Sequence, residues 1–156
     1  MQERLARLAD ATQAAAWPTA PTARADWLAQ TIATLGGAAR AGWPNDGALQ
    51  RAAAALLAIP LAILEPRWHQ AGFPVFDRPD MLFASRHLLL AGIRDERVRP
   101  WVETVAAQQD PTGRWQLRRS RQRESGCTFE VPGEPSRWLT AQALSVLRGF
   151  YGESDG

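Results

Sequence analysis

Four arginines within six residues form the densest group of side chains that could bind a charged ligand. They lie in the run RRSRQR, as Arg118, Arg119, Arg121 and Arg123. A guanidinium presents a planar fork of N–H donors that fits phosphate and carboxylate oxygens. The run therefore predicts an anion site for a diphosphate, an acidic protein or nucleic acid. Glutamates follow at positions 124, 130 and 134, so the alternative interpretation is a solvated loop whose charges balance.

Catalytic acids, metal ligands and nucleophiles are sparse. Asp80 stands at the start of one expected helix and Asp95 directly before another, where a carboxylate caps the first N–H groups. His69, His87 and Cys127 are the chain's only histidines and cysteine, and no two of them are closely spaced. Zinc needs three or four ligands, and no local signature marks a cysteine–histidine nucleophile pair. We therefore predict no catalytic residue, no metal and no cofactor.

Aromatic side chains between residues 68 and 76 could line an apolar pocket suited to an isoprenoid. The candidate lining residues are Trp68, Phe73, Phe76, Asp80 and His87. Aromatic residues next to turns more often serve as part of the core, since each of them buries a large area. Both interpretations stay open at the level of the sequence.

Helical periodicity and capping residues predict six helices that would position these side chains. The expected ranges are 2–16, 22–35, 47–64, 79–91, 96–109 and 137–151, with caps at Asp46, Asp80, Asp95 and Ser136. Gly36 and Gly37 should end the second helix. The third is apolar on nearly all sides, which predicts a central position, and Pro60 should kink or divide it.

Few residues favour strands. The stretch 110–135 is a long polar loop, and its one candidate strand, 127–132, has no evident partner and is interpreted as loop or a short hairpin arm. The fold class is therefore all-α, with about six helices in antiparallel pairs. The domain boundaries are 1–151 for a single helical domain and 152–156 for a polar tail.

Composition indicates a globular protein. Of 156 residues, 46% are hydrophobic and 22% charged, which fits one domain with its own core. The longest apolar run, 52–64, is too short to span a bilayer. No secretory signal is visible, and a single cysteine excludes an internal disulfide, so we expect a cytoplasmic protein. The net charge of +2 does not favour nucleic acid as the partner.

Residues 109–115, QDPTGRW, have the form Q-x-x-x-G-x-W. This motif resembles the QW repeat of the squalene and hopene cyclases and of the wider terpenoid cyclase/prenyltransferase-like α/α toroids, and the resemblance covers about residues 72–151. It implies a partial toroid in which Gln109, Gly113 and Trp115 form a structural clasp. The Gln109 amide would join unpaired carbonyls at a helix end to N–H groups of the next helix. Gly113 would adopt a positive φ, and Trp115 would lie against the amide.

The expected function is a non-enzymatic helical-repeat module that binds a protein partner or an apolar ligand. The chain lacks the acidic D-x-D-D motif of the cyclases and is too short to close a toroid. An exposed inner face would favour a homodimer. The first alternative is an isoprenoid-handling enzyme resembling terpenoid cyclases and prenyltransferases, with Arg118–Arg123 as its diphosphate site. The second is nucleic-acid binding through the same arginines.

Overall fold

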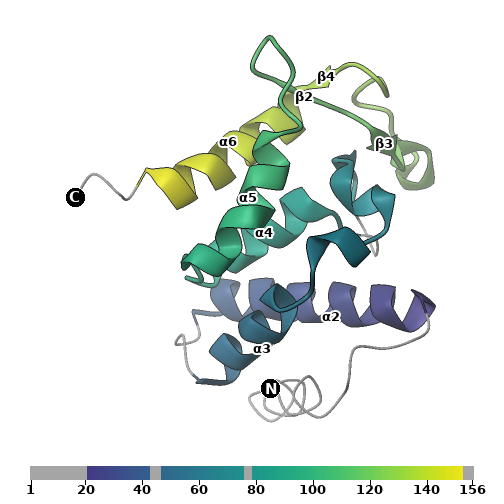
Figure 1. Ribbon diagram of the computed structural model, residues 1–156. Coiled ribbons are helices and arrows are strands. Elements are labelled where there is room, and N and C mark those ends of the chain that lie inside the picture. Colours follow the sequence, from purple (N-terminus) through teal and green to yellow (C-terminus); the bar gives the residue numbers. More distant parts are fainter. Residues whose placement is uncertain (1–20, 43–46, 76–78, 153–156) are drawn as a thin grey trace.

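The computed structural model describes residues 21–42, 47–75 and 79–152. These ranges are mostly helical and contain five α-helices: α2 (Pro21–Arg40), α3 (Gly47–Leu57), α4 (Met81–Leu90), α5 (Arg99–Ala106) and α6 (Arg137–Tyr151) (Figure 1). Short 3-10 helices are η1 (Leu61–Ile63), η2 (Pro66–His69), η3 (Glu96–Val98) and η4 (Gln122–Ser125). The predicted helix 2–16, the predicted cap Asp46 and the aromatic Phe76 lie outside the described residues.

Three of the predicted helix caps are confirmed. The Asp80 carboxylate accepts a hydrogen bond from the Phe83 backbone N–H at 3.0 Å at the start of α4. Asp95 accepts one from the Arg97 N–H at the start of η3. The Ser136 hydroxyl accepts one from the Leu139 N–H at the start of α6. These bonds satisfy N–H groups that have no partner within the helix.

Two predicted helix ends are wrong. Helix α2 runs through Gly36 and Gly37 to Arg40, because Gly36 is buried against the next layer, where tertiary packing outweighs the low helix propensity of glycine. Helix α3 ends at Leu57, and Pro60 starts the separate η1 turn. The predicted helix is therefore divided before Pro60, which is one of the two outcomes expected for this proline.

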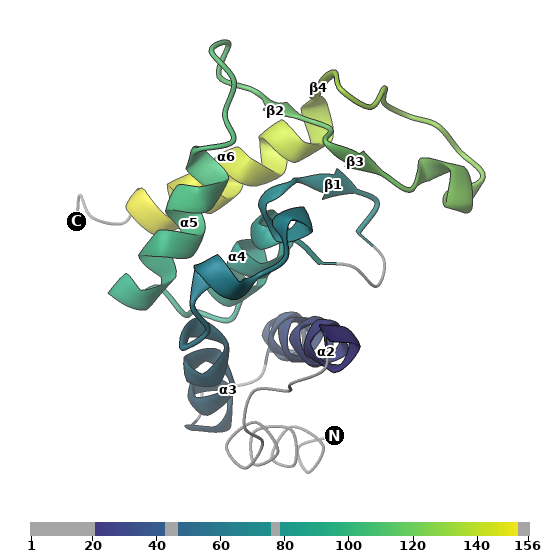
Figure 2. The same cartoon turned by 45° about the vertical axis from the view of Figure 1, so that its right-hand side comes forward.

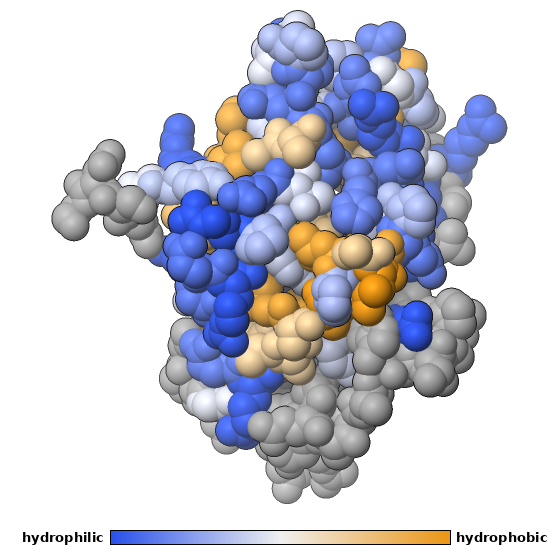
Figure 3. All heavy atoms as spheres, viewed as in Figure 1, coloured by the Kyte–Doolittle hydropathy of each residue, from blue (hydrophilic) through white to orange (hydrophobic). Residues whose placement is uncertain are grey.

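The central helix is α4 and not the predicted helix at 47–64. Helix α4 packs against α2, α5 and α6, whereas α3 packs chiefly against α2. Seven of the ten α4 residues are buried: Met81, Leu82, Ala84, Ser85, His87, Leu88 and Leu89. Beyond α3, Ala58, Pro60, Ala62 and Ile63 are exposed, and Figure 3 shows apolar side chains gathered on the surface over this part of the chain.

Two small sheets correct the all-α prediction. Strand β1 (Gly72–Phe73) pairs in parallel with β3 (Arg119–Ser120), and β2 (Trp115–Gln116) pairs in antiparallel fashion with β4 (Pro135–Ser136). Figures 1 and 2 show these strands and their connections at one end of the helices. The stretch 127–132 contains no strand, which confirms its interpretation as loop.

Candidate functional site

The predicted clasp at residues 109–115 is a tight turn that is bonded to itself. Gly113 has a φ of 81°, which confirms the expected positive value. The Gln109 Nε2 donates to the Gly113 carbonyl at 3.1 Å. One carboxylate oxygen of Asp110 accepts from the backbone N–H groups of Thr112 and Arg114 at 2.8 and 3.0 Å. The side-chain amide of Gln109 thus closes the turn and does not reach the next helix.

The link between helices that was expected of Gln109 is made by its neighbours. Trp115 is buried, its indole N–H donates to the Val105 carbonyl of α5 at 2.7 Å, and its backbone N–H donates to the Thr140 hydroxyl of α6 at 3.1 Å. Gln108 donates to the Thr104 carbonyl at 3.1 Å and accepts from the Ala71 N–H at 3.0 Å. Trp115 therefore joins α5 to α6, and Gln108 joins α5 to the segment before β1.

One of the four predicted anion-binding arginines has a structural role. The Arg119 guanidinium donates to the Gln70 carbonyl at 3.0 Å, and its Nη2 lies 3.5 Å from Asp80 Oδ2. The same Asp80 oxygen accepts from the Gly72 N–H at 2.9 Å. Burial raises the pKa of the Asp80 carboxyl, while the backbone N–H groups and Arg119 act in the opposite direction. Together these bonds join the start of α4 to β1 and β3.

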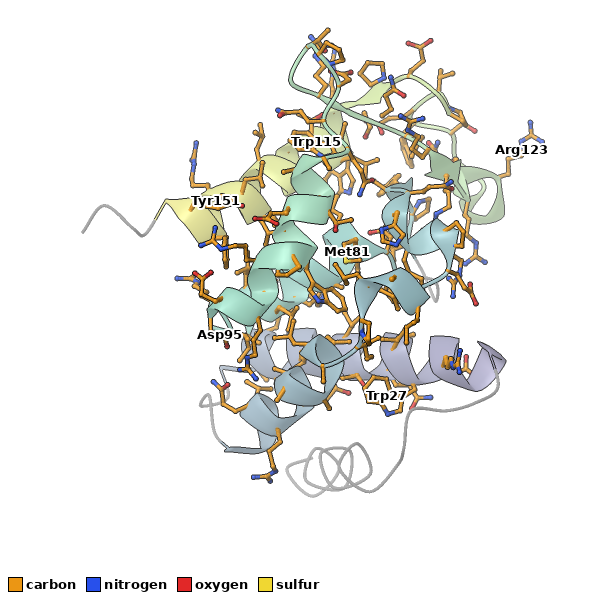
Figure 4. All side chains as sticks on the ribbon, viewed as in Figure 1. Trp27, Met81, Asp95, Trp115, Arg123 and Tyr151 are labelled. Carbon is orange, nitrogen blue, oxygen red and sulfur yellow. The ribbon has the colours of Figure 1, made fainter. Side chains whose placement is uncertain are left out.

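The other arginines of the run lie at or near the surface. Arg118 and Arg123 are exposed and Arg121 is half-buried, with its backbone N–H bonded to the Phe73 carbonyl at 3.3 Å. Figure 4 shows the Arg123 side chain pointing outward. Of the four arginines, Arg118 and Arg123 are therefore the two that are freely accessible to solvent.

The residues proposed for an apolar pocket are distributed over different parts of the fold. Trp68 belongs to the main hydrophobic core. Phe73 is half-buried, and its ring centroid lies 5.6 Å from that of Trp138. Asp80 caps α4. His87 is buried between α4 and α2, and its Nδ1 lies 2.8 Å from the Phe83 carbonyl oxygen.

A surface feature that the sequence did not predict lies in the loop of residues 127–133, which we call the display loop. Phe129 and Val131 are 71% and 62% exposed. The buried side chain of Gln122 holds the backbone between them. Its Oε1 accepts from the N–H groups of Phe129 and Glu130 at 2.5 and 2.9 Å, and its Nε2 donates to the Glu130 carbonyl at 2.7 Å.

The Glu130 side chain fixes the display loop from the opposite direction. Its carboxylate accepts hydrogen bonds from the Ser136 hydroxyl and from the Trp138 backbone N–H, the latter at 3.2 Å. A carboxylate at a helix N-terminus is also favoured by the helix dipole. Glu130 is thus bonded to the start of α6, while its two apolar neighbours are exposed. Trp138, in the first turn of α6, is itself 53% exposed.

The display loop belongs to a positively charged stretch of the chain. Residues 114–138 contain six arginines and three glutamates, a net charge of +3, although the whole chain carries only +2. Arg118, Arg123 and Arg137 are exposed within this stretch. The surface therefore combines large apolar side chains on a fixed backbone with accessible guanidinium groups.

Comparisons with known proteins give no relative for this chain. No family model, no curated protein and no solved structure matches it. Among the described residues, no three His, Cys, Asp or Glu side chains are grouped so that they could hold a metal ion. None of the helices in the described ranges has the length and apolar character needed to cross a membrane.

Proposed function

We propose that this protein is a helical module without enzymatic activity that binds a partner protein through the display loop and the first turn of α6. The observation that carries the proposal is the exposure of Phe129 and Val131 on a backbone that Gln122 and Glu130 hold in place. Exposed apolar side chains are typical of binding surfaces. A loop that is ordered before binding loses less conformational entropy when the complex forms.

The charge around the loop indicates what kind of partner fits. Arg118, Arg123 and Arg137 favour an acidic protein surface, because complementary charges speed association and select partners. A second copy of this chain would present the same +3 stretch, so repulsion disfavours self-association through this face. The partner we propose carries an apolar pocket or groove with acidic residues at its rim.

Site-specific cross-linking tests the proposal. A photoreactive amino acid replaces Phe129 in the full chain, and in a second version it replaces Leu144, an apolar residue of α6 that is 48% exposed outside the display loop. Both versions are irradiated in an extract of the cells that produce the protein, and cross-linked proteins are identified by mass spectrometry. We expect a partner that is captured from position 129 and not from position 144.

The affinity of the purified partner for variants of the chain then tests whether the display loop is the binding surface. The double variant Phe129→Ser, Val131→Ser should weaken the affinity by about tenfold or more, since exposed anchors of this kind contribute over 1 kcal/mol each. Leu144→Ser should change it less than about twofold, and added salt should weaken binding. Equal loss in both variants would contradict the proposal. If the unaltered chain forms a dimer that dissociates in the double variant, the surface mediates self-association and the proposed partner protein is wrong.

A specific observation also favours the enzyme alternative. Asp80 is a buried carboxyl with a raised pKa, and the isoprenoid cyclases that the QW motif resembles protonate an alkene with such an acid. The positive φ of Gly113 and the buried Trp115 between α5 and α6 support the proposed relation of this chain to a partial α/α toroid. Against it, both Asp80 oxygens already accept N–H bonds.

Turnover of prenyl diphosphates separates the two candidates. The enzyme alternative requires a product that disappears in Asp80→Asn and persists in Asp110→Asn, an exposed acid of the 109–115 turn. We expect no product from the unaltered chain. A product with this mutational pattern would establish the enzyme and overturn the module.

A further inference from the structure

A pocket between α4 and α6 lies away from the display loop. It has a volume of ≈ 170 Å³ and an apolar wall formed by Leu89 and Leu90 of α4 and Val146 of α6. Gly149 of α6 faces Leu89 of α4 here, and a Cβ at this position would make an ordinary contact, 3.5 Å from Leu89 Cδ1. The volume is below the range of about 300–1,000 Å³ that is common for drug-sized ligands. Only a small molecule fits.

Two arginines line the same pocket. Arg86 belongs to α4 and Arg94 follows that helix. Arg86 is half-buried and makes no hydrogen bond or ion pair with the residues that the structure describes. A guanidinium carries five N–H donors and stays charged at any pH that a protein experiences. An unpaired, partly desolvated arginine at the edge of a pocket therefore favours a bound anion.

The two acids that directly follow Arg94 in the sequence are engaged elsewhere. Asp95 forms two bonds of 2.8 Å with the Arg97 guanidinium, and Glu96 binds Arg99 at 2.6 and 2.8 Å. Burial lowers the pKa of the adjacent His87, and the positive charges of Arg40 and Arg86 add to this effect. Ser145, which also lines the pocket, adds a hydroxyl that can donate to an anion.

We propose that the pocket between α4 and α6 binds a small organic anion that has a carboxylate or phosphate head and a short apolar tail. Arg86 and Arg94 bind the head, and Leu89, Leu90 and Val146 contact the tail. This site is separate from the proposed protein-binding surface, because Gly149 follows Trp138 by eleven residues of the same helix, about 16 Å along its axis. Figure 4 likewise shows Arg123 on the opposite side of the molecule from Tyr151, the last residue of α6.

Titration of the full chain with four probes tests the site. The probes are hexanoate, hexyl phosphate, hexanol and inorganic phosphate. Binding of each probe is measured by calorimetry and by amide shifts in NMR spectra. We expect one or both amphiphilic anions to bind and to shift amides of α4 and α6. Hexanol and inorganic phosphate should bind at least about fivefold more weakly, because each offers only half of the recognised chemistry. Preference between hexanoate and hexyl phosphate identifies the head.

Two variants that each remove one positive charge separate binding at the pocket from attraction by the net charge of the chain. Arg86→Gln should weaken binding of the preferred anion about tenfold, as expected for loss of a charge-assisted hydrogen bond, while Arg51→Gln, at an exposed residue of α3, should leave it within about twofold. Equal weakening by both variants would show general attraction by net charge and overturn the site. So would the absence of binding, or hexanol binding as tightly as the anions. None of these outcomes bears on the display loop, which Arg86→Gln leaves intact.

Discussion

The helical body and the 108–136 region are held together by different forces. In the body, α4 is surrounded by α2, α5 and α6, and most of the residues it buries are apolar. In the 108–136 region, order depends on polar side chains bonded to the backbone, above all Gln108, Gln122 and Glu130. Burial of apolar area stabilises the first. Hydrogen bonds that fix an exposed surface stabilise the second.

This difference indicates which kind of substitution should destabilise each region most. A close-packed interior tolerates little change of volume, so the body should be sensitive to a single methyl group. An irregular region with few apolar contacts opens locally, so the 108–136 region should be sensitive to the loss of one amide. Three predictions test this contrast.

The largest effect is expected from a methyl group between α2 and α4. A Cβ at Gly36 would lie 1.8 Å from His87 Cδ2, whereas a Cβ at Gly37 would meet nothing within 4 Å. Gly36→Ala should therefore lower the free energy of unfolding by about 1–3 kcal/mol. Gly37→Ala should raise it by about 0.5–1 kcal/mol, because alanine is the better helix former. Urea unfolding measures both, and destabilisation of equal size would refute the predicted contact.

A smaller and local effect is expected in the display loop. Gln122→Ala removes the acceptor of the Phe129 and Glu130 N–H groups, which should cost about 1–2 kcal/mol in local stability. Hydrogen exchange at these two amides should accelerate about tenfold or more, with little change in the amides of α4. Gln142→Ala, in α6, serves as the control. Uniform acceleration throughout the molecule would mean that the region unfolds only together with the body.

The smallest effect is a dependence of stability on pH. Burial lowers the pKa of His87, and the charges of Arg40 on α2 and Arg86 on α4 add to this, while the bond to the Phe83 carbonyl opposes it. Below pH ~6.5 the unfolded chain takes up a proton that the folded protein binds less readily, so the free energy of unfolding should fall. His87→Gln should flatten this slope between pH ~7.5 and ~5.5. Identical slopes in both proteins would contradict the prediction.

Much of the secondary structure was predictable because its causes are local. Asp80, Asp95 and Ser136 begin their helices through bonds to residues two or three positions ahead. The range 137–151 is the observed range of α6. Gly113 has its positive φ because of a four-residue turn. Such bonds depend on residue type and spacing within one turn, which a sequence displays directly.

The candidate site was predictable only in part. The arginine run was visible, but Arg119 is bound to Asp80, 39 positions away. The exposure of Phe129 was not visible, because apolar residues are usually placed inside until the fold shows otherwise. Gln109 was assigned a bridge that Gln108 makes, since adjacent glutamines point in different directions and the partner, Ala71, is 37 residues distant.

By itself, the sequence determined the helical character, the starts of three helices and the turn at Gly113, because these follow from bonds between near neighbours. Only the tertiary structure decided that α4 is central, that α2 continues through Gly36, and that the display loop carries exposed apolar side chains. The physical reason is that burial and long-range hydrogen bonds depend on which surfaces meet. No spacing within a single segment encodes that choice.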